Sequence, residues 1–579
     1  MSPDRPIRKR GLERPVVVLA VLLLAGGAIR FWGLSQKGLF HFDEGMHAKE
    51  AIQAHAKMRF WIKSITTLIE EKATGRQLWT KAQAQAEYQE ALRAGAPMRF
   101  ARPLLVQSAA VLMFFVHAPD VALMALSALA GCLSIGAVYL IGRRFAGSFL
   151  GLLAAAMLAF SGYHVIYSRS AFADVLPTAL LLFALLGMLH CLRIAPAAAL
   201  GKRAFLSGLL CGMAFTANCR YVAPMAFCVV GLVLELAWQT RPRLFKSVTR
   251  FLLCWVGGFL VGPLLFEGWS HAEFLLARKL NLPFDQLTYI EQLFGQSHLH
   301  RDAFAATFSA ATAFQRLPLE FPYLYARLTG FLPLLMAVIG LAGLFRRRRP
   351  GWLALACAAL GPWVFFSLFS HTAARFFVPC VPFLSLAAAV PFLALKEGPK
   401  SGGRKDRAVF WLLAAGFGLL IGEEIGRDIG LVRLRSGYRD AVSYLESNRG
   451  TPRHISTQAH VTGLYAGLDN TAFPPATRND LRELCHQGFR YYLVDAQARI
   501  GGFGGQAKEK LGVVEEIQAA LDPVARIANP SAAHFLFWFE DNYDFWGTLR
   551  FVRRLDQTPW GRIEIYDLQP LIAAEAEGA

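Results

Sequence analysis

The sequence predicts an α-helical polytopic membrane protein with about eleven transmembrane helices and a small C-terminal α/β soluble domain. Hydrophobic residues make up 55% of the 579 positions and charged residues only 17%, against roughly 25% charged in a soluble protein. Apolar runs of about twenty residues recur before position 425, each long enough to cross a hydrocarbon core of about 30 Å. Basic clusters separate these runs, and the chain after Asp428 is no longer membrane-like.

Each apolar run is expected to be helical, because lipid offers no hydrogen-bond partner to backbone amides. The first span is predicted at 15–34, after a basic N-terminus that stays in the cytoplasm. Later spans are predicted at 119–142, 148–167, 175–193, 204–219, 222–240, 250–268, 328–346, 351–370, 375–395 and 407–425.

The basic clusters predict the orientation of these spans. With this set of spans, all of them fall on the cytoplasmic side, as the positive-inside rule requires: 8–10, 143–144, 202–203, 241–250, 346–349 and 400–407. The net charge of +19 is therefore a membrane signature, and no nucleic-acid partner is expected. We predict a multi-pass protein of the inner (plasma) membrane, with membrane lipids as its surroundings.

The orientation divides the chain into two domains. Residues 1–427 form a transmembrane domain with two large outer loops, at 35–118 and 269–327. Residues 428–579 form an extracytoplasmic α/β domain, with helices expected at Tyr438–Asn448 and Arg478–His486 and strands at Phe489–Val494 and Ile563–Asp567.

The short cytoplasmic connections carry no nucleotide-binding motif. Charged residues gather at the outer ends of spans and not near their middles, which favours an interfacial site over an ion-conduction path. Any chemistry is therefore expected at the outer face.

The first candidate motif, Phe40–Ala48, places Asp43 and Glu44 shortly after the first span. A carboxylate at the interface could accept a proton from an attacking hydroxyl. His47 would share the helix face of Asp43, so His41, Asp43 and His47 could also bind a metal. The structural alternative is that the acidic pair caps a helix N-terminus.

Two further motifs lie at predicted outer turns. The segment Tyr163–Asp174 contains Arg169 and Asp174. Arg169 could simply anchor to lipid headgroups, and Asp174 could simply cap the fourth span. The segment His371–Pro382 contains Arg375, whose guanidinium could bind a lipid phosphate through two parallel hydrogen bonds or simply extend to the interface.

In this order, the three motifs resemble those of the GT-C superfamily of membrane glycosyltransferases, in the branch of protein O-mannosyltransferases and aminoarabinose transferases (bacterial family 39-like). The matching features are Asp43-Glu44, Ser168-Arg169 with Asp174, and Arg375-Phe376 with Pro379 and Pro382. Two departures are Arg102-Pro103-Leu104, where the family often has His/Lys-Pro-Pro, and Phe376 in place of the usual tyrosine.

The resemblance implies transfer of a sugar from a polyprenyl-phosphate donor to a hydroxyl of a glycan, lipid or protein acceptor, with inversion at the anomeric carbon. It implies Asp43 as the base, with Glu44 and Asp174 orienting the catalytic site, and Arg375 with Arg169 as the donor phosphate partners. Glu44 and Asp174 could alternatively hold a divalent metal ion, the only cofactor suggested, and the candidate metal ligands are Asp43, His47 and Asp174. A transporter or flippase of lipid-linked glycans, or a non-enzymatic assembly protein for them, is the alternative.

Overall fold

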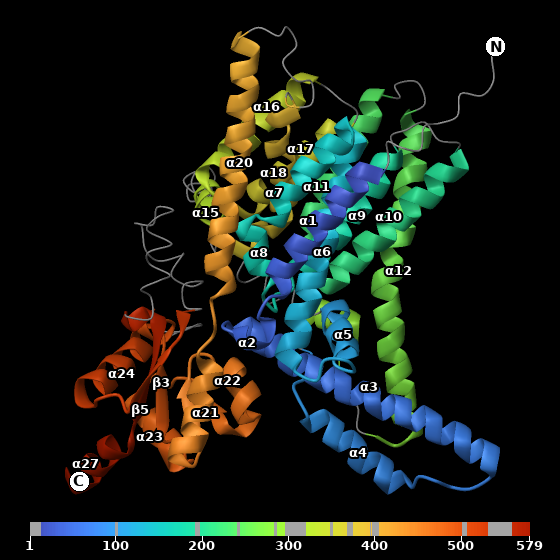
Figure 1. Ribbon diagram of the computed structural model, residues 1–579. Helices are drawn as coiled ribbons and strands as arrows, with labels where there is room; N and C mark the ends of the chain where they lie inside the picture. The colour runs from blue at the N-terminus through green and yellow to red at the C-terminus, as the bar shows by residue number, and fades with distance from the viewer. Residues whose placement is uncertain are drawn as a thin grey trace, which may run out of the picture.

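The chain folds as a bundle of membrane-length helices with additional helices and a small sheet at one end (Figure 1). The computed structural model describes residues 13–98, 102–191, 197–239, 244–282, 287–295, 320–347, 351–367, 374–393, 395, 404–500, 507–530 and 558–578.

Within the described residues, six helical segments are long and apolar enough to cross a membrane, or seven if one bent pair forms a single span. The six contain α1 (Glu13–Phe31), α6 (Pro119–Ala146), α11 (Val222–Gln239), α12 (Leu244–Lys279), η4 with α18 (Ala374–Cys380 and Val381–Ala389), and α20 (Arg404–Val432). The bent pair is α7 with α8 (Ser148–Ala159 and Gly162–Ser168), at 62°. The predicted helical membrane fold is confirmed, while the predicted count of about eleven spans stays a prediction.

Other helices complete the bundle at the remaining predicted spans: α9 (Val175–Cys191), α10 (Ala197–Ala217), η2 (Cys219–Tyr221), α15 (Glu320–Thr329), α16 (Phe331–Arg347), α17 (Trp352–Ser367) and η5 (Pro391–Leu393). Glycines allow α10 and α12 to approach closely: a Cβ at Gly208 would lie 1.9 Å from the Trp255 carbonyl oxygen, and one at Gly212 would lie 2.1 Å from that of Phe259. Small residues are the usual means of close packing between membrane helices.

The predicted first loop is mostly helical and lies at the lower end of the bundle in Figure 1. It comprises α2 (Leu34–Lys37), α3 (Phe42–Thr74), α4 (Lys81–Arg93) and α5 (Pro103–Leu112). The second predicted outer loop begins within a helix, because α12 continues past position 269 to Lys279, and its placement outside the membrane stays a prediction. The extension has a partner that holds it as a helix: Glu273 pairs with Lys57 and accepts a hydrogen bond from the Trp61 indole on α3. Residues 283–286 and 296–319 of that loop lie outside the described residues.

The C-terminal segment contains a five-stranded sheet of order β2-β1-β3-β5-β4. β1 runs parallel to β2 and β3, and β5 runs antiparallel to β3 and β4. The strands are β1 (His454–Ser456), β2 (Thr471–Ala472), β3 (Tyr491–Val494), β4 (Ala525–Ala528) and β5 (Arg562–Asp567). The helices are α21 (Tyr438–Arg449), α22 (Ala459–Ala466), η6 (Leu468–Asn470), α23 (Arg478–His486), η7 (Ala498–Ile500), α24 (Ala507–Ala520), η10 (Pro559–Gly561) and α27 (Gln569–Gly578).

The predicted elements of this segment match α21, α23, β3 and β5 in place. Its start differs, because α20 continues to Val432, past the predicted boundary at 427/428. A placement outside the membrane stays a prediction.

The sheet domain rests on the N-terminal part of α3 through α22. The Phe42 and His460 rings lie 4.4 Å apart, centroid to centroid. A Cβ at Gly45 would lie 2.5 Å from the His460 carbonyl carbon, so only glycine permits this approach. The position of α3 therefore depends on the C-terminal domain.

Candidate active site

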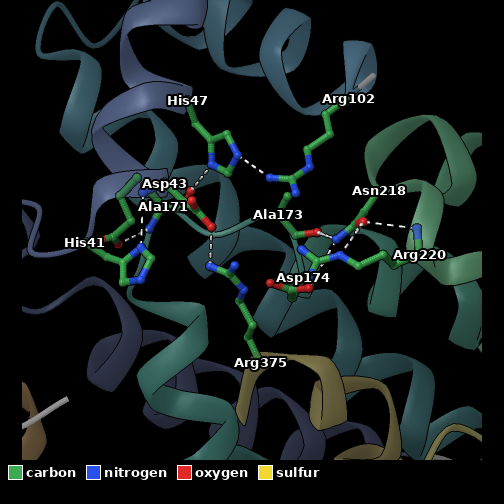
Figure 2. Close-up of polar contacts among 11 residues, drawn as sticks. His41, Asp43, His47, Arg102, Ala171, Ala173, Asp174, Asn218, Arg220 and Arg375 are labelled. Carbon is green, nitrogen blue, oxygen red and sulfur yellow. Dashed lines mark hydrogen bonds and ion pairs between the residues drawn. The ribbon is translucent and has the colours of Figure 1, made fainter. Parts of the chain in front are cut away.

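An ion pair joins two of the sequence motifs. Asp43 lies in the first turn of α3, and Arg375 lies in η4. The Arg375 Nη1 is 2.5 Å from the Asp43 Oδ2, and the two side chains keep 16% and 17% of their surface exposed. Figure 2 shows the two side chains pointing toward each other at the centre of the group. Because neither is fully buried, a ligand can reach both partners.

The helix cap next to Asp43 is made by other residues. The His41 Nδ1 accepts from the Asp43 backbone N–H at 3.1 Å, and the Glu44 carboxylate accepts from the His41 backbone N–H, which completes a capping box. In this arrangement the Asp43 carboxylate takes no part in the cap. Glu44 therefore takes part in capping α3, as the structural alternative predicted, whereas the Asp43 carboxylate contacts Arg375.

The Glu44 carboxylate accepts hydrogen bonds from backbone N–H groups. It is fully buried and also accepts from the Phe40 and Ala171 backbone N–H groups, at 3.0 and 2.7 Å. These bonds join the start of α3 to the segment before α9. These hydrogen bonds come from backbone N–H groups and none involves Arg375 or Asp174, and the orienting role of Glu44 stays a prediction.

Asp174 faces the same group from the start of α9. Its Oδ1 accepts from the Asn218 side-chain amide at 3.2 Å, and the Asn218 Oδ1 accepts from the Arg220 Nε at 3.3 Å. Among the described residues its Oδ2 has no hydrogen-bond partner, although it is buried. Burial raises the pKa of this carboxyl, and the guanidinium groups of Arg220 and Arg375 oppose the rise. Asp174 thus presents one oxygen to an incoming donor group.

His47 lies one helical turn beyond Asp43 and is fully buried. Its Nδ1 lies 3.0 Å from the Ala171 carbonyl oxygen, and its Nε2 contacts the Arg102 Nη1. A carbonyl can only accept and a guanidinium can only donate, so the imidazole is neutral with its proton on Nδ1. Burial, followed by the Arg102 charge, lowers the pKa of His47 to about 3.

These contacts do not fit the predicted metal site. A ligand histidine needs one ring nitrogen for the metal, but both nitrogens of His47 are occupied. The described residues contain no group of three or more His, Cys, Asp or Glu side chains placed to hold a metal ion.

Cations outnumber anions at this site. The guanidinium groups of Arg102, Arg220 and Arg375 surround the carboxylates of Asp43 and Asp174 (Figure 2), so these five side chains carry one net positive charge. Burial alone would raise the pKa of Asp43, but Arg375, together with His41 and Arg102, holds it well below its usual range. An anionic ligand such as a phosphate would be attracted here.

Aromatic rings hold the guanidinium groups in place. The Arg375 guanidinium carbon lies 4.9 Å from the Phe172 ring centroid, and that of Arg220 lies 4.3 Å from the Phe376 ring centroid. Such cation–π contacts are attractive and orient the planar group. Phe376, the departure from the Arg-Tyr pair of the resembled family, therefore has a role as a platform for Arg220.

Arg169 is not brought to this group. Its guanidinium donates to the carbonyls of Ile29, Arg30 and Val432, at 2.6, 3.2 and 3.3 Å. These bonds join the end of α1 to the end of α20, so the structure gives Arg169 a bridging position between helices. Of the predicted site residues, Asp43, His47, Asp174 and Arg375 lie together.

Three members of the group were not predicted as site residues: Arg102, Asn218 and Arg220. One signal for the latter two was in the sequence, since Asn218 and Arg220 interrupt an apolar segment, where polar residues are costly and commonly functional. Arg102 carried a weaker signal, at a position where the resembled family has its own basic residue.

The chain matches no known family profile, and no curated protein is similar to it in sequence. It is similar in structure to ArnT from Cupriavidus metallidurans bound to undecaprenyl phosphate, at 14% identity and a TM-score of 0.49, over 95% of this chain and 97% of that one. It is also similar to the archaeal oligosaccharyltransferase AglB from Archaeoglobus fulgidus in complex with an inhibitory peptide and a dolichol-phosphate. That match has 14% identity and a TM-score of 0.49, over 87% of this chain and 72% of AglB. At this identity and TM-score, neither match assigns a donor, an acceptor or a residue role to this chain.

Proposed function

We propose that this protein is a membrane glycosyltransferase that moves a sugar from a polyprenyl-phosphate donor to an acceptor hydroxyl on the non-cytoplasmic face. The observation that carries the proposal is the Asp43–Arg375 pair, a carboxylate and a guanidinium that are both partly exposed. The pair supplies the two groups that the reaction needs, a proton acceptor and a phosphate partner.

The ion pair itself supports an order of events. While Arg375 holds it, Asp43 is a weak base, because its pKa lies well below its usual range. A donor phosphate that binds Arg375 would displace the Asp43 carboxylate, since both anions compete for one guanidinium. Once free of that charge, Asp43 would be a stronger base, so donor binding would activate it.

In the reaction, the acceptor oxygen attacks the anomeric carbon of the donor sugar as its proton passes to Asp43. The bond from that carbon to the phosphate oxygen breaks, and the electron pair leaves with polyprenyl phosphate. Arg375 and Arg220 stabilise the added charge on the phosphate, and Asp174 orients the sugar through its free Oδ2. Attack opposite to the leaving group inverts the anomeric carbon. We assign no metal ion to these steps, because both ring nitrogens of His47 already contact other groups.

The test uses the full chain in lipid nanodiscs with undecaprenyl-phosphate glucose and undecaprenyl-phosphate mannose as probes. The producing cell's glycolipid and glycan fractions serve as acceptors. The proposal predicts release of undecaprenyl phosphate and transfer of the sugar to an acceptor. Translocation of the intact donor between leaflets without release would support the flippase alternative, and binding without either event would support a non-enzymatic assembly protein.

A further inference from the structure

A second polar pocket lies beside the candidate active site, between α3, α5 and α12. Its cavity volume is about 50 Å³, within an empty space of about 690 Å³ that includes the part open to solvent. Glu50 and Lys57 of α3, Pro103 of α5, and Trp269 and Glu273 of α12 are among its lining residues. It is built from side chains that the catalytic proposal does not use.

The pocket and the active site share one helix and one turn. Asp43, His47 and Glu50 follow one another along a single face of α3. The seven residues from Asp43 to Glu50 span about 10 Å of helix. Arg102, which contacts His47, directly precedes the pocket residue Pro103. Along α3, the nearest lining residue of the pocket, Glu50, therefore lies about 10 Å from Asp43.

Several polar atoms in the lining lack a hydrogen-bond partner in the portion of the chain that the structure describes. The Tyr289 Oη, the Gln107 Oε1 and the Gln292 Oε1 are buried and, among the described residues, have no hydrogen-bond partner. Buried polar groups are nearly always satisfied, so three such atoms around one pocket indicate a ligand or ordered water that supplies the missing bonds. One hydroxyl donor and two amide acceptors suit a ligand that is rich in hydroxyl groups.

The charge of the lining argues against a second phosphate. Its charged side chains are Glu50, Lys57 and Glu273, and Lys57 is already paired with Glu273. The balance is one net negative charge, which repels an anionic headgroup and suits a neutral or amino-bearing ligand.

Aromatic faces complete the lining. Trp269 is 48% exposed, and Trp61 is fixed by its indole hydrogen bond to Glu273 at 3.1 Å. Flat apolar rings next to carboxylate and amide groups match the two kinds of surface on a sugar, its C–H face and its ring of hydroxyls.

We infer that this pocket is the acceptor subsite and that it binds a neutral or amino saccharide, so that the acceptor is a glycan. The inference depends on the proposed function, because it assigns the pocket to the acceptor of that reaction. A peptide or a phospholipid headgroup would be the competing occupant.

Saturation-transfer-difference NMR on the full chain in nanodiscs tests this assignment without turnover. The probes are cellobiose, N,N′-diacetylchitobiose and glucosamine, with glycerophosphate and a serine-containing tripeptide as competitors, and the Asp43–Arg375 site is kept saturated with undecaprenyl phosphate throughout. We expect saturation transfer to at least one sugar and none to the competitors. Transfer only to a competitor, or to none of the probes, would overturn the inference.

Two variants locate the binding. Tyr289→Phe removes only a hydroxyl that has no hydrogen-bond partner within the described part of the chain, so the protein should fold as before and bind the sugar several-fold more weakly. Trp269→Ala removes an exposed ring and should weaken sugar binding about tenfold. The matched control is Trp238→Ala, an exposed tryptophan on α11 outside the pocket lining, which should bind the sugar normally. Unchanged sugar binding in both pocket variants would also overturn the inference.

Native mass spectrometry with undecaprenyl phosphate separates this inference from the proposed function. Donor-lipid binding should persist in both pocket variants. If the unaltered protein does not bind undecaprenyl phosphate, the result counts against the proposed function. If it binds undecaprenyl phosphate but no sugar, the result counts against the acceptor subsite alone.

Discussion

The Asp43 carboxylate and the Arg375 guanidinium form an ion pair at 2.5 Å, although they come from opposite ends of the helical bundle's sequence. The pair joins the first turn of α3 to η4, the 3-10 helix that directly precedes α18. In the proposed mechanism, Arg375 binds Asp43 when no donor is present and binds the donor phosphate when the donor arrives. This exchange would couple donor binding to activation of Asp43 as a base.

Arg375→Lys should lower turnover while the protein still inserts and folds. Lysine keeps the charge but not the planar pair of donors, and the lost hydrogen bond to a charged group is worth about 1.5–3 kcal/mol. Turnover should therefore fall about 10- to 150-fold, measured as release of undecaprenyl phosphate. Arg490→Lys is the matched control, because Arg490 forms a 2.5 Å pair with Asp567 in the C-terminal domain. Near-normal turnover by Arg375→Ala would remove this residue from the mechanism.

Glu44→Gln should damage the fold more than the chemistry. The Glu44 oxygens accept from three backbone N–H groups, and an amide nitrogen in place of one oxygen would face a donor. We expect a loss of about 2–3 kcal/mol in stability, seen as a lower apparent Tm, with turnover per folded molecule within a few-fold of normal. An unchanged Tm with abolished turnover would instead give Glu44 a catalytic role.

His47 should make stability depend on pH. Its pKa is about 3 in the folded protein against an ordinary 6.5, so acid protonates the unfolded chain first. The stabilisation is complete above about pH 6.5 and is lost as pH falls toward 3, by about 2 kcal/mol between pH 6.5 and 5. Apparent Tm measured from pH 7.5 to 5 should fall less steeply in His47→Gln than in the unaltered protein. Equal slopes would show that His47 is not held neutral.

Gly45→Ala tests the contact between α3 and the C-terminal domain. The added methyl would meet the backbone of His460 and Val461 at 2.5 Å, so α22 must move and Asp43 would shift with α3. We expect a lower apparent Tm and lower turnover, both measured on purified protein. Gly136→Ala in α6 is the control, because a Cβ there meets nothing within 4 Å and alanine favours the helix. Equal behaviour of the two variants would contradict the dependence of α3 on this domain.

The sequence predicted the helical membrane class, the α/β tail and the pairing of two distant motifs in one site. The sequence could not show which of Asp43 and Glu44 caps the helix and which contacts Arg375, because that depends on which backbone amides lie near each carboxylate. Arg169 shows the same limit: its motif suggested a phosphate partner, but long-range contacts direct it to the carbonyls of α1 and α20. Asn218 and Arg220 join the site through contacts with residues distant in sequence, Asp174 and Phe376, which a single sequence does not reveal.

The most direct test of the central claim is the turnover of Asp43→Asn beside its donor-lipid binding. Asparagine keeps the size and most of the hydrogen bonding of aspartate but cannot take the proton. Release of undecaprenyl phosphate should fall about 10²–10⁴-fold, while native mass spectrometry still detects bound undecaprenyl phosphate and the apparent Tm stays close to normal. A folded Asp43→Asn protein that transfers sugar at the unaltered rate would contradict the account.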